Sequence, residues 1–111
     1  MGISAVEVTN TGRIAGGGSN LVTGISNAYR VVNSGTIEVT GTAVSLGEDF
    51  YGTPGRLTNS GTITSASTVA VRSINFGSTV DNQAGGVISG RTGLYLPGGA
   101  VANAGTINGS A

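Results

Sequence analysis

The feature that most constrains the fold of this chain is a short phrase that recurs five times along its 111 residues. Each copy places an asparagine two residues after a Val or Leu, and then a glycine shortly before an isoleucine. The asparagines are Asn10, Asn33, Asn59, Asn82 and Asn103. They follow one another at steps of 23, 26, 23 and 21 residues, a period typical of solenoid proteins. We therefore expect a stack of similar units.

Composition favours β structure for these units. The chain holds 21 Gly, 2 Pro and many Ser, Thr, Asn and Val, and no segment shows helical spacing over three turns. Charged residues make up only 9% of the chain, whereas disordered segments combine low hydrophobicity with high charge. The length fits one domain. The sequence predicts a single all-β unit over residues 1–111.

Each repeat is predicted to contain about three short strands separated by Gly or Asn turns. One strand approaches the asparagine, as in Arg56–Thr58 and Ala100–Val101, and a second ends on the isoleucine. The remaining strands are expected at Ile25 and at apolar pairs that follow the isoleucines. These pairs are Val44 and Leu46, Val69 and Val71, and Leu94 and Leu96.

Stacking these repeats in parallel would build a narrow shared core with neighbouring strands about 4.8 Å apart. Two inward ladders are expected, one of Val8, Val31, Leu57, Val80 and Val101 and one of Ile14, Ile37, Ile63, Ile88 and Ile107. Asparagine suits a sharp corner and its side chain can bond to the backbone of the next repeat, so the asparagines are predicted to form a structural ladder. The glycine that follows is expected to supply a positive φ. Two extra residues before Ile88 predict an outward bulge.

Charge and residue types exclude several classes of function. The formal net charge is zero, from five Arg and five acidic residues, so no nucleic-acid partner and no basic membrane-binding face are expected. Lys, His and Cys are absent, which removes common general bases, Schiff-base amines, metal ligands and disulfides. No signal peptide and no membrane-spanning segment are visible. We predict no cofactor, and any export signal is expected outside this chain.

The longest departure from the repeat is the segment 47–56, which combines charges, aromatics and a proline. Loops on a rigid scaffold often carry function, so Glu48, Asp49, Phe50 and Tyr51 are the candidate recognition residues. Phe50 and Tyr51 with the neighbouring acids could bind a carbohydrate, and Glu48, Asp49 and loop carbonyls could bind calcium. Tyr95, between two leucines, is expected to point outward.

Catalysis is not predicted. Hydrolysis of a sugar bond needs two suitably spaced carboxylates, and the adjacent Glu48 and Asp49 would point to opposite faces of an extended chain. Glu38, Asp49 and Asp81 would serve only if the fold brought them together. No catalytic, cofactor-binding or metal-binding residue is therefore assigned.

The repeated phrases resemble the passenger regions of bacterial autotransporters and haemagglutinin-like surface proteins. The matching stretches are 33–37, 59–63, 103–107 and 93–96. The resemblance implies a right-handed parallel β-helix, here of four to five coils of 21 to 26 residues, exported to the cell surface or secreted. It also implies a role in adhesion, autoaggregation or display.

A structural or adhesive solenoid is the expected function, with a carbohydrate-binding module using residues 47–56 as the alternative. The solenoid is expected to be elongated, with unpaired strands at both ends, an arrangement that favours end-to-end pairing. The expected partners are therefore further copies of the chain stacked into filaments, or adjoining repeats of a longer chain. A surface glycan or protein is a further expected partner, and direct membrane insertion is not expected.

Overall fold

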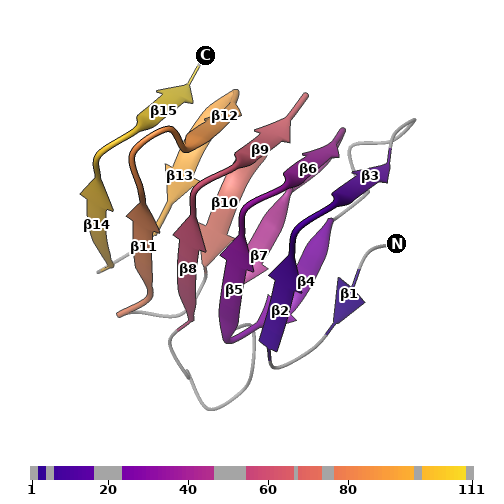
Figure 1. Cartoon of the computed structure of the whole chain (residues 1–111), viewed down its shortest axis with the longest axis horizontal. Helices are drawn as coiled ribbons and strands as arrows, with labels where there is room; N and C mark the ends of the chain where they lie inside the picture. Colours follow the sequence, from indigo (N-terminus) through magenta and orange to yellow (C-terminus); the bar gives the residue numbers. More distant parts are fainter. Residues whose placement is uncertain are drawn as a thin grey trace.

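Three parallel β-sheets wind around a narrow interior in the computed structural model of the chain (Figure 1). The structure describes residues 3–4, 7–16, 24–46, 55–66, 68–73, 77–96 and 99–109. Each sheet has five strands, and the chain visits the three sheets in a fixed order. Every regular element in the described ranges is a strand. The predicted all-β parallel solenoid is confirmed.

The three sheets, here named A, B and C, each take one strand from every coil. Sheet A contains β1 (Ile3–Ser4), β4 (Ile25–Ala28), β7 (Val44–Leu46), β10 (Val69–Ser73) and β13 (Thr92–Tyr95). Sheet B contains β2 (Glu7–Asn10), β5 (Arg30–Asn33), β8 (Arg56–Asn59), β11 (Thr79–Asn82) and β14 (Ala100–Asn103). Sheet C contains β3 (Arg13–Gly16), β6 (Thr36–Val39), β9 (Thr62–Ser65), β12 (Val87–Gly90) and β15 (Thr106–Gly109). The first coil is β1 to β3 and the fifth is β13 to β15.

Alternation of side chains along the strands of sheets B and C directs one set of their residues into the core, which sheet A completes with residues such as Val44 and Val71. In β5, β8 and β11 the second and fourth residues are buried, as the two-residue period of a strand requires. Pairing in register places equivalent residues above one another, with Val31 beside Leu57 and Ile37 beside Ile63. These four side chains are fully buried. Burying one such side chain between neighbouring coils stabilises the fold by roughly 1.5–3 kcal/mol. This burial holds the stacked coils together.

Sheet A follows a register that the sequence spacing did not indicate. Ile25 pairs with Val44, and Val71, rather than Val69, pairs with both Val44 and Leu94. The chain takes seven residues from Ile37 to Val44 but eight from Ile63 to Val71. Corners of different length join sheet C to sheet A, so equal distance along the chain does not mean equal position in the stack.

The corner glycines are required by the closeness of the coils. We expected positive φ after each asparagine, but among the described residues only Gly77 and Gly85 are recorded as glycines with positive φ. A Cβ added at Gly35 would overlap the carbonyl oxygen of Gly12, and one added at Gly61 would overlap that of Gly35. The expectation holds for Gly85 of the fourth repeat and was wrong for the other corners. At Gly35 and Gly61 the glycine instead admits the backbone of the coil before it, a close approach that excludes any side chain.

The extra residues of the fourth repeat form a turn at the corner. The Gly86 amide donates to the Gln83 carbonyl at 2.9 Å, and Gly85 between them has a φ of 82°. Gln83, Ala84 and Gly85 are exposed, so the predicted bulge is present. Register is restored directly afterwards, because Val87 pairs with Thr62.

The body is nearly as broad as it is long, with principal extents of 31, 29 and 29 Å. Five strands at the parallel spacing of about 4.8 Å span roughly 20 Å, which is comparable with the width of one coil. The expectation of an elongated shape was wrong for this reason. The stack presents two broad ends, formed by β1 to β3 and by β13 to β15 (Figure 1).

Replacing a corner glycine inside the stack should therefore be costly. We expect Gly61→Ala to lower the free energy of unfolding by about 1–3 kcal/mol, as is typical of overpacking, because its Cβ would overlap the backbone of the second coil. Gly12→Ala is the matched control, since a Cβ at Gly12 meets nothing within 4 Å. Chemical denaturation followed by circular dichroism measures both; equal stability of the two variants would contradict the steric explanation.

Candidate functional site

A ladder of asparagine side chains runs through the corner between sheets B and C. Hydrogen bonds join Asn10 Nδ2 to Asn33 Oδ1 at 2.9 Å and Asn33 Nδ2 to Asn59 Oδ1 at 2.8 Å. The series continues from Asn59 to Asn82 and from Asn82 to Asn103, both at 2.9 Å. Every link runs in one direction, from the amide nitrogen of one coil to the amide oxygen of the next.

The same side chains also satisfy the backbone at the corner. Asn33 Nδ2 lies 3.3 Å from the carbonyl oxygen of Gly35 in its own coil and 3.3 Å from that of Thr62 in the next. Asn59 Oδ1 additionally accepts the Gly61 amide at 3.3 Å. Asn33, Asn59 and Asn82 have no exposed surface. Since a buried polar group without a partner costs about 1–3 kcal/mol, this bonding explains how amides reside beside an apolar core.

Serine hydroxyls perform a second structural task that the sequence analysis missed. Ser65 Oγ donates to the Gly41 carbonyl at 2.6 Å and accepts the Thr68 amide at 3.0 Å. Ser73 and Ser78 hydroxyls lie 2.7 Å apart, and Ser78 also accepts the Gly55 amide at 2.9 Å. These buried serines stabilise corners. Serine as a residue type does not indicate this role, because other described serines, such as Ser34 and Ser60, are exposed.

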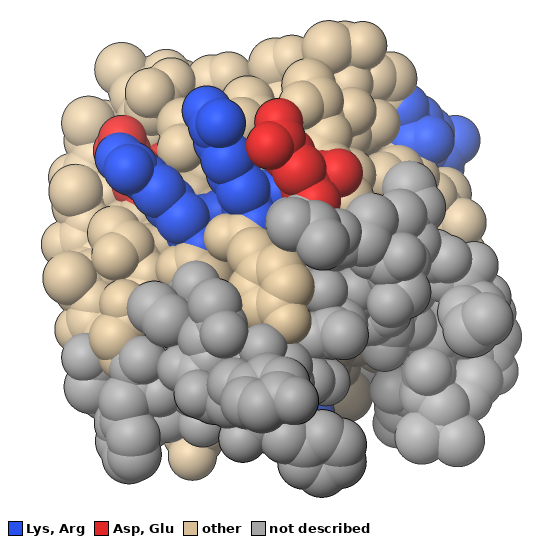
Figure 2. Space-filling model, turned by 90° about the horizontal axis from the view of Figure 1, so that it is seen from below, with Lys and Arg blue, Asp and Glu red and all other residues tan. Residues whose placement is uncertain are grey.

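The charged side chains of sheet B lie on its outer surface. Figure 2 shows acidic and basic groups next to one another on the face seen from below. Glu7, Arg30 and Arg56 stand at matching positions of β2, β5 and β8. Arg30 Nη1 is 4.0 Å from Glu7 Oε2, and both side chains are more than half exposed. Exposed pairs of this kind contribute little, roughly 0–1 kcal/mol.

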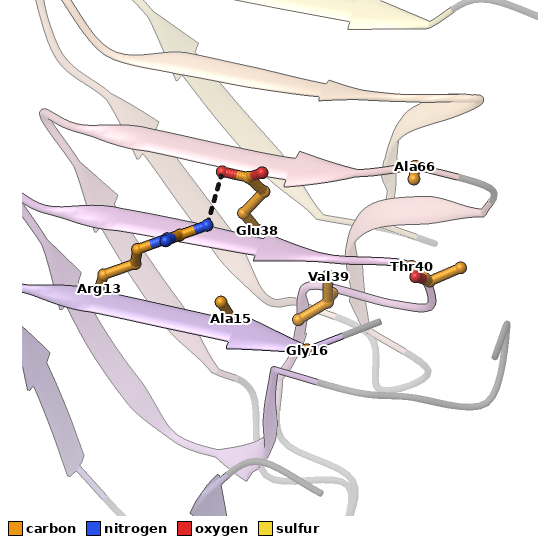
Figure 3. Close-up of a pocket in the computed structure, with 7 residues that line it drawn as sticks. All are labelled: Arg13, Ala15, Gly16, Glu38, Val39, Thr40 and Ala66. Carbon is orange, nitrogen blue, oxygen red and sulfur yellow. Dashed lines mark ion pairs between the residues drawn. The ribbon is translucent and has the colours of Figure 1, made fainter. Parts of the chain in front are cut away.

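One shallow depression lies over sheet C, at the ends of β3 and β6 (Figure 3). Arg13 and Glu38 point toward each other across neighbouring strands there, with Nη2 and Oε2 separated by 3.8 Å. The rest of its lining is Ala15, Gly16, Val39, Thr40 and Ala66. Small aliphatic groups and one solvated ion pair provide no enclosed surface for a ligand.

The carboxylates do not gather on the described surface. Glu38 lies in sheet C, whereas Asp81 lies in sheet B. No group of three potential metal-ligating side chains occurs within the described ranges. The expected recognition residues Glu48, Asp49, Phe50 and Tyr51 lie outside the described residues, so their arrangement stays a prediction. Tyr95 is 54% exposed, as its position between two leucines indicated.

Comparisons with known proteins assign no family. No protein-family model, curated protein or solved structure matches the chain significantly. A search of the described residues for long apolar helices able to cross a membrane found none.

Replacing an asparagine inside the ladder should destabilise the fold more than replacing one at its end. We expect Asn59→Ala to lower the free energy of unfolding by at least about 2 kcal/mol, because it leaves the buried Asn33 Nδ2 and Asn82 Oδ1 each without one partner. Asn103→Ala, at the exposed last position, is the control and should cost less than half as much. Urea denaturation compares the two; similar losses would show that the ladder links contribute little.

Proposed function

We propose that this chain is a structural β-solenoid of a secreted or bacterial surface protein, which serves as a rigid scaffold for adhesion or display. The observation that carries the proposal is the continuous asparagine ladder. It links all five coils through four side-chain hydrogen bonds of 2.8 to 2.9 Å. Its amides are engaged within the stack, and their evident role is to fix one coil on the next.

The outer surface supports the same proposal. Outward positions of sheet C carry short polar side chains such as Thr36, Thr62 and Thr64, and its described ion pair is solvent-exposed. A hydrated surface of hydroxyl groups with few charges suits a spacer that must remain inert along its length. The proposed surface location rests on the resemblance of the repeated Asn-Ser-Gly-Thr-Ile phrases to surface-protein passenger regions.

A scaffold and a carbohydrate-binding module differ in how they respond to glycans. We expect the chain to show no saturable binding on a glycan array, because the depression over sheet C is shallow and is lined mainly by small side chains. Binding that disappears in Phe50→Ala and Tyr51→Ala but persists in the control Tyr95→Ala would contradict the scaffold proposal. It would instead assign recognition to residues 47–56.

A further inference from the structure

The fifth coil leaves part of its apolar interior uncovered. All four residues of β14 are exposed, and Val101 among them is 47% exposed, whereas its equivalent Val80 in the fourth coil has no exposed surface. Ile107 and Leu94 pack on the core but are only partly buried, although Ile88 in the fourth coil is fully buried. The end of the stack formed by β13 to β15 is therefore a partly apolar surface.

The opposite end of the stack does not present an equivalent surface in sheet B. Val8 and Asn10 are the first-coil equivalents of Val101 and Asn103, and they are only 7% and 8% exposed. They are covered within the single chain and need no partner. Along this column of described residues, only the fifth coil leaves its inward side chains open to another molecule.

Hydrogen-bonding groups at the fifth coil are unpaired as well. The Ala104 amide donates to the Asn82 carbonyl of the fourth coil at 2.8 Å. No described residue donates to the equivalent carbonyl, that of Asn103, and Asn103 Nδ2 has no described acceptor. Because β14 and β15 each have one paired neighbour among the described strands, their free edges are templates for pairing with another chain.

The fifth coil also differs from the others in charge. The five Arg and five acidic residues of the chain all precede Thr92, so residues 92–111 carry no charged side chain. Proteins commonly protect a free edge with charges, proline or a bulge, and none of these occurs within β14 or β15. An uncharged end can face an identical end without opposing like charges. This favours a second copy of the chain as the partner.

Two identical ends can meet around a two-fold axis that crosses the stack. Such an axis reverses the direction of every strand, so strands of the two copies would pair antiparallel. If the axis passes through the corner at Ala104, β14 of one copy lies along β15 of the other. Val101 of one copy then lies opposite Ile107 of the other, which would join their two interiors.

The backbone of both strands is suited to this register. The amides of Ala100 and Thr106 donate to the fourth coil. Val101 and Ile107 are the next residue in each strand, and their amides and carbonyls therefore face the free edge. Opposite residues of an antiparallel pair can exchange both backbone hydrogen bonds. The pairing of Val101 with Ile107 thus meets the hydrogen-bonding and the packing requirement together.

We propose that two copies of this chain associate tail to tail through their fifth coils, with β14 of each copy paired antiparallel to β15 of the other. Because both copies use the same surface, the contact is isologous and closes as a dimer, whereas the sequence predicted filaments. The first coils would lie at the two far ends of the dimer. This inference goes beyond the proposed scaffold function and does not depend on it.

One experiment places a charge on the open end. Val101→Lys would bury an ammonium group in the interface, which is costly, and Thr58→Lys is the matched control because it adds the same charge on the outer face of the central coil, beside Asp81. Sedimentation velocity across a concentration series gives the mass, and circular dichroism verifies folding. The unmodified chain and Thr58→Lys should reach a dimer and nothing larger, whereas Val101→Lys should stay monomeric over the same range.

A second experiment tests the register of the two copies. The chain has no Cys, so a single introduced Cys can form a disulfide only between copies. Ala104→Cys would lie beside the two-fold axis, where the Cα atoms can approach within the roughly 4.4–6.8 Å that a disulfide needs. Mild oxidation should convert it to a covalent dimer on non-reducing electrophoresis, and adding Val101→Lys should prevent this. Thr11→Cys, at the exposed corner of the first coil, is the matched control and should stay monomeric.

Each of three results would contradict the tail-to-tail dimer. The unmodified chain could remain monomeric at all concentrations, it could grow beyond a dimer, or Thr11→Cys could cross-link as readily as Ala104→Cys. A folded, monomeric chain that binds no glycan would still agree with the scaffold function. Conversely, glycan binding through residues 47–56 would contradict the scaffold function and leave the dimer standing.

Discussion

The close vertical contact between coils is the constraint on which the rest of this structure depends. No coil has a core of its own, since each contributes only a few inward side chains and buries them against its neighbours. Backbones therefore approach until there is no room for a side chain at the corner, as at Gly35 and Gly61. Glycine is required at these two positions by the contact between coils, and the stacked apolar side chains of sheets B and C are buried by the same contact.

The asparagine ladder is the polar counterpart of those columns. An amide offers both donors and acceptors, so identical residues in every coil can bond in series and still reach carbonyls above and below. Serine or threonine could not match this with one hydroxyl hydrogen. Because each link joins only adjacent coils, stability in such a stack is a sum of nearest-neighbour terms, and its internal coils should be held more firmly than its last.

Much of this fold could be predicted from the sequence because the repeat is strict where coils touch. The spacing of Asn10 and Asn33, and of Ile14 and Ile37, gave the correct register for sheets B and C. The register of sheet A was not predicted, because the corners that lead into it vary in length. As a result Val71, rather than Val69, pairs with Val44. The amide-to-amide links were also missed, since turn chemistry suggests bonding of asparagine to backbone but does not reveal that equivalent side chains meet.

The turn at Gln83–Gly86 has a consequence for how such a chain can change over evolutionary time. Its additional residues are accommodated outside the stack, and the pairing of Val87 with Thr62 resumes at once. Coil length and strand register are thus separable properties. Insertions at corners can accumulate, and whole repeats can be duplicated or lost, without altering the positions that neighbouring coils recognise. Corners can therefore differ in length and sequence while the spacing between coils along the stack stays the same.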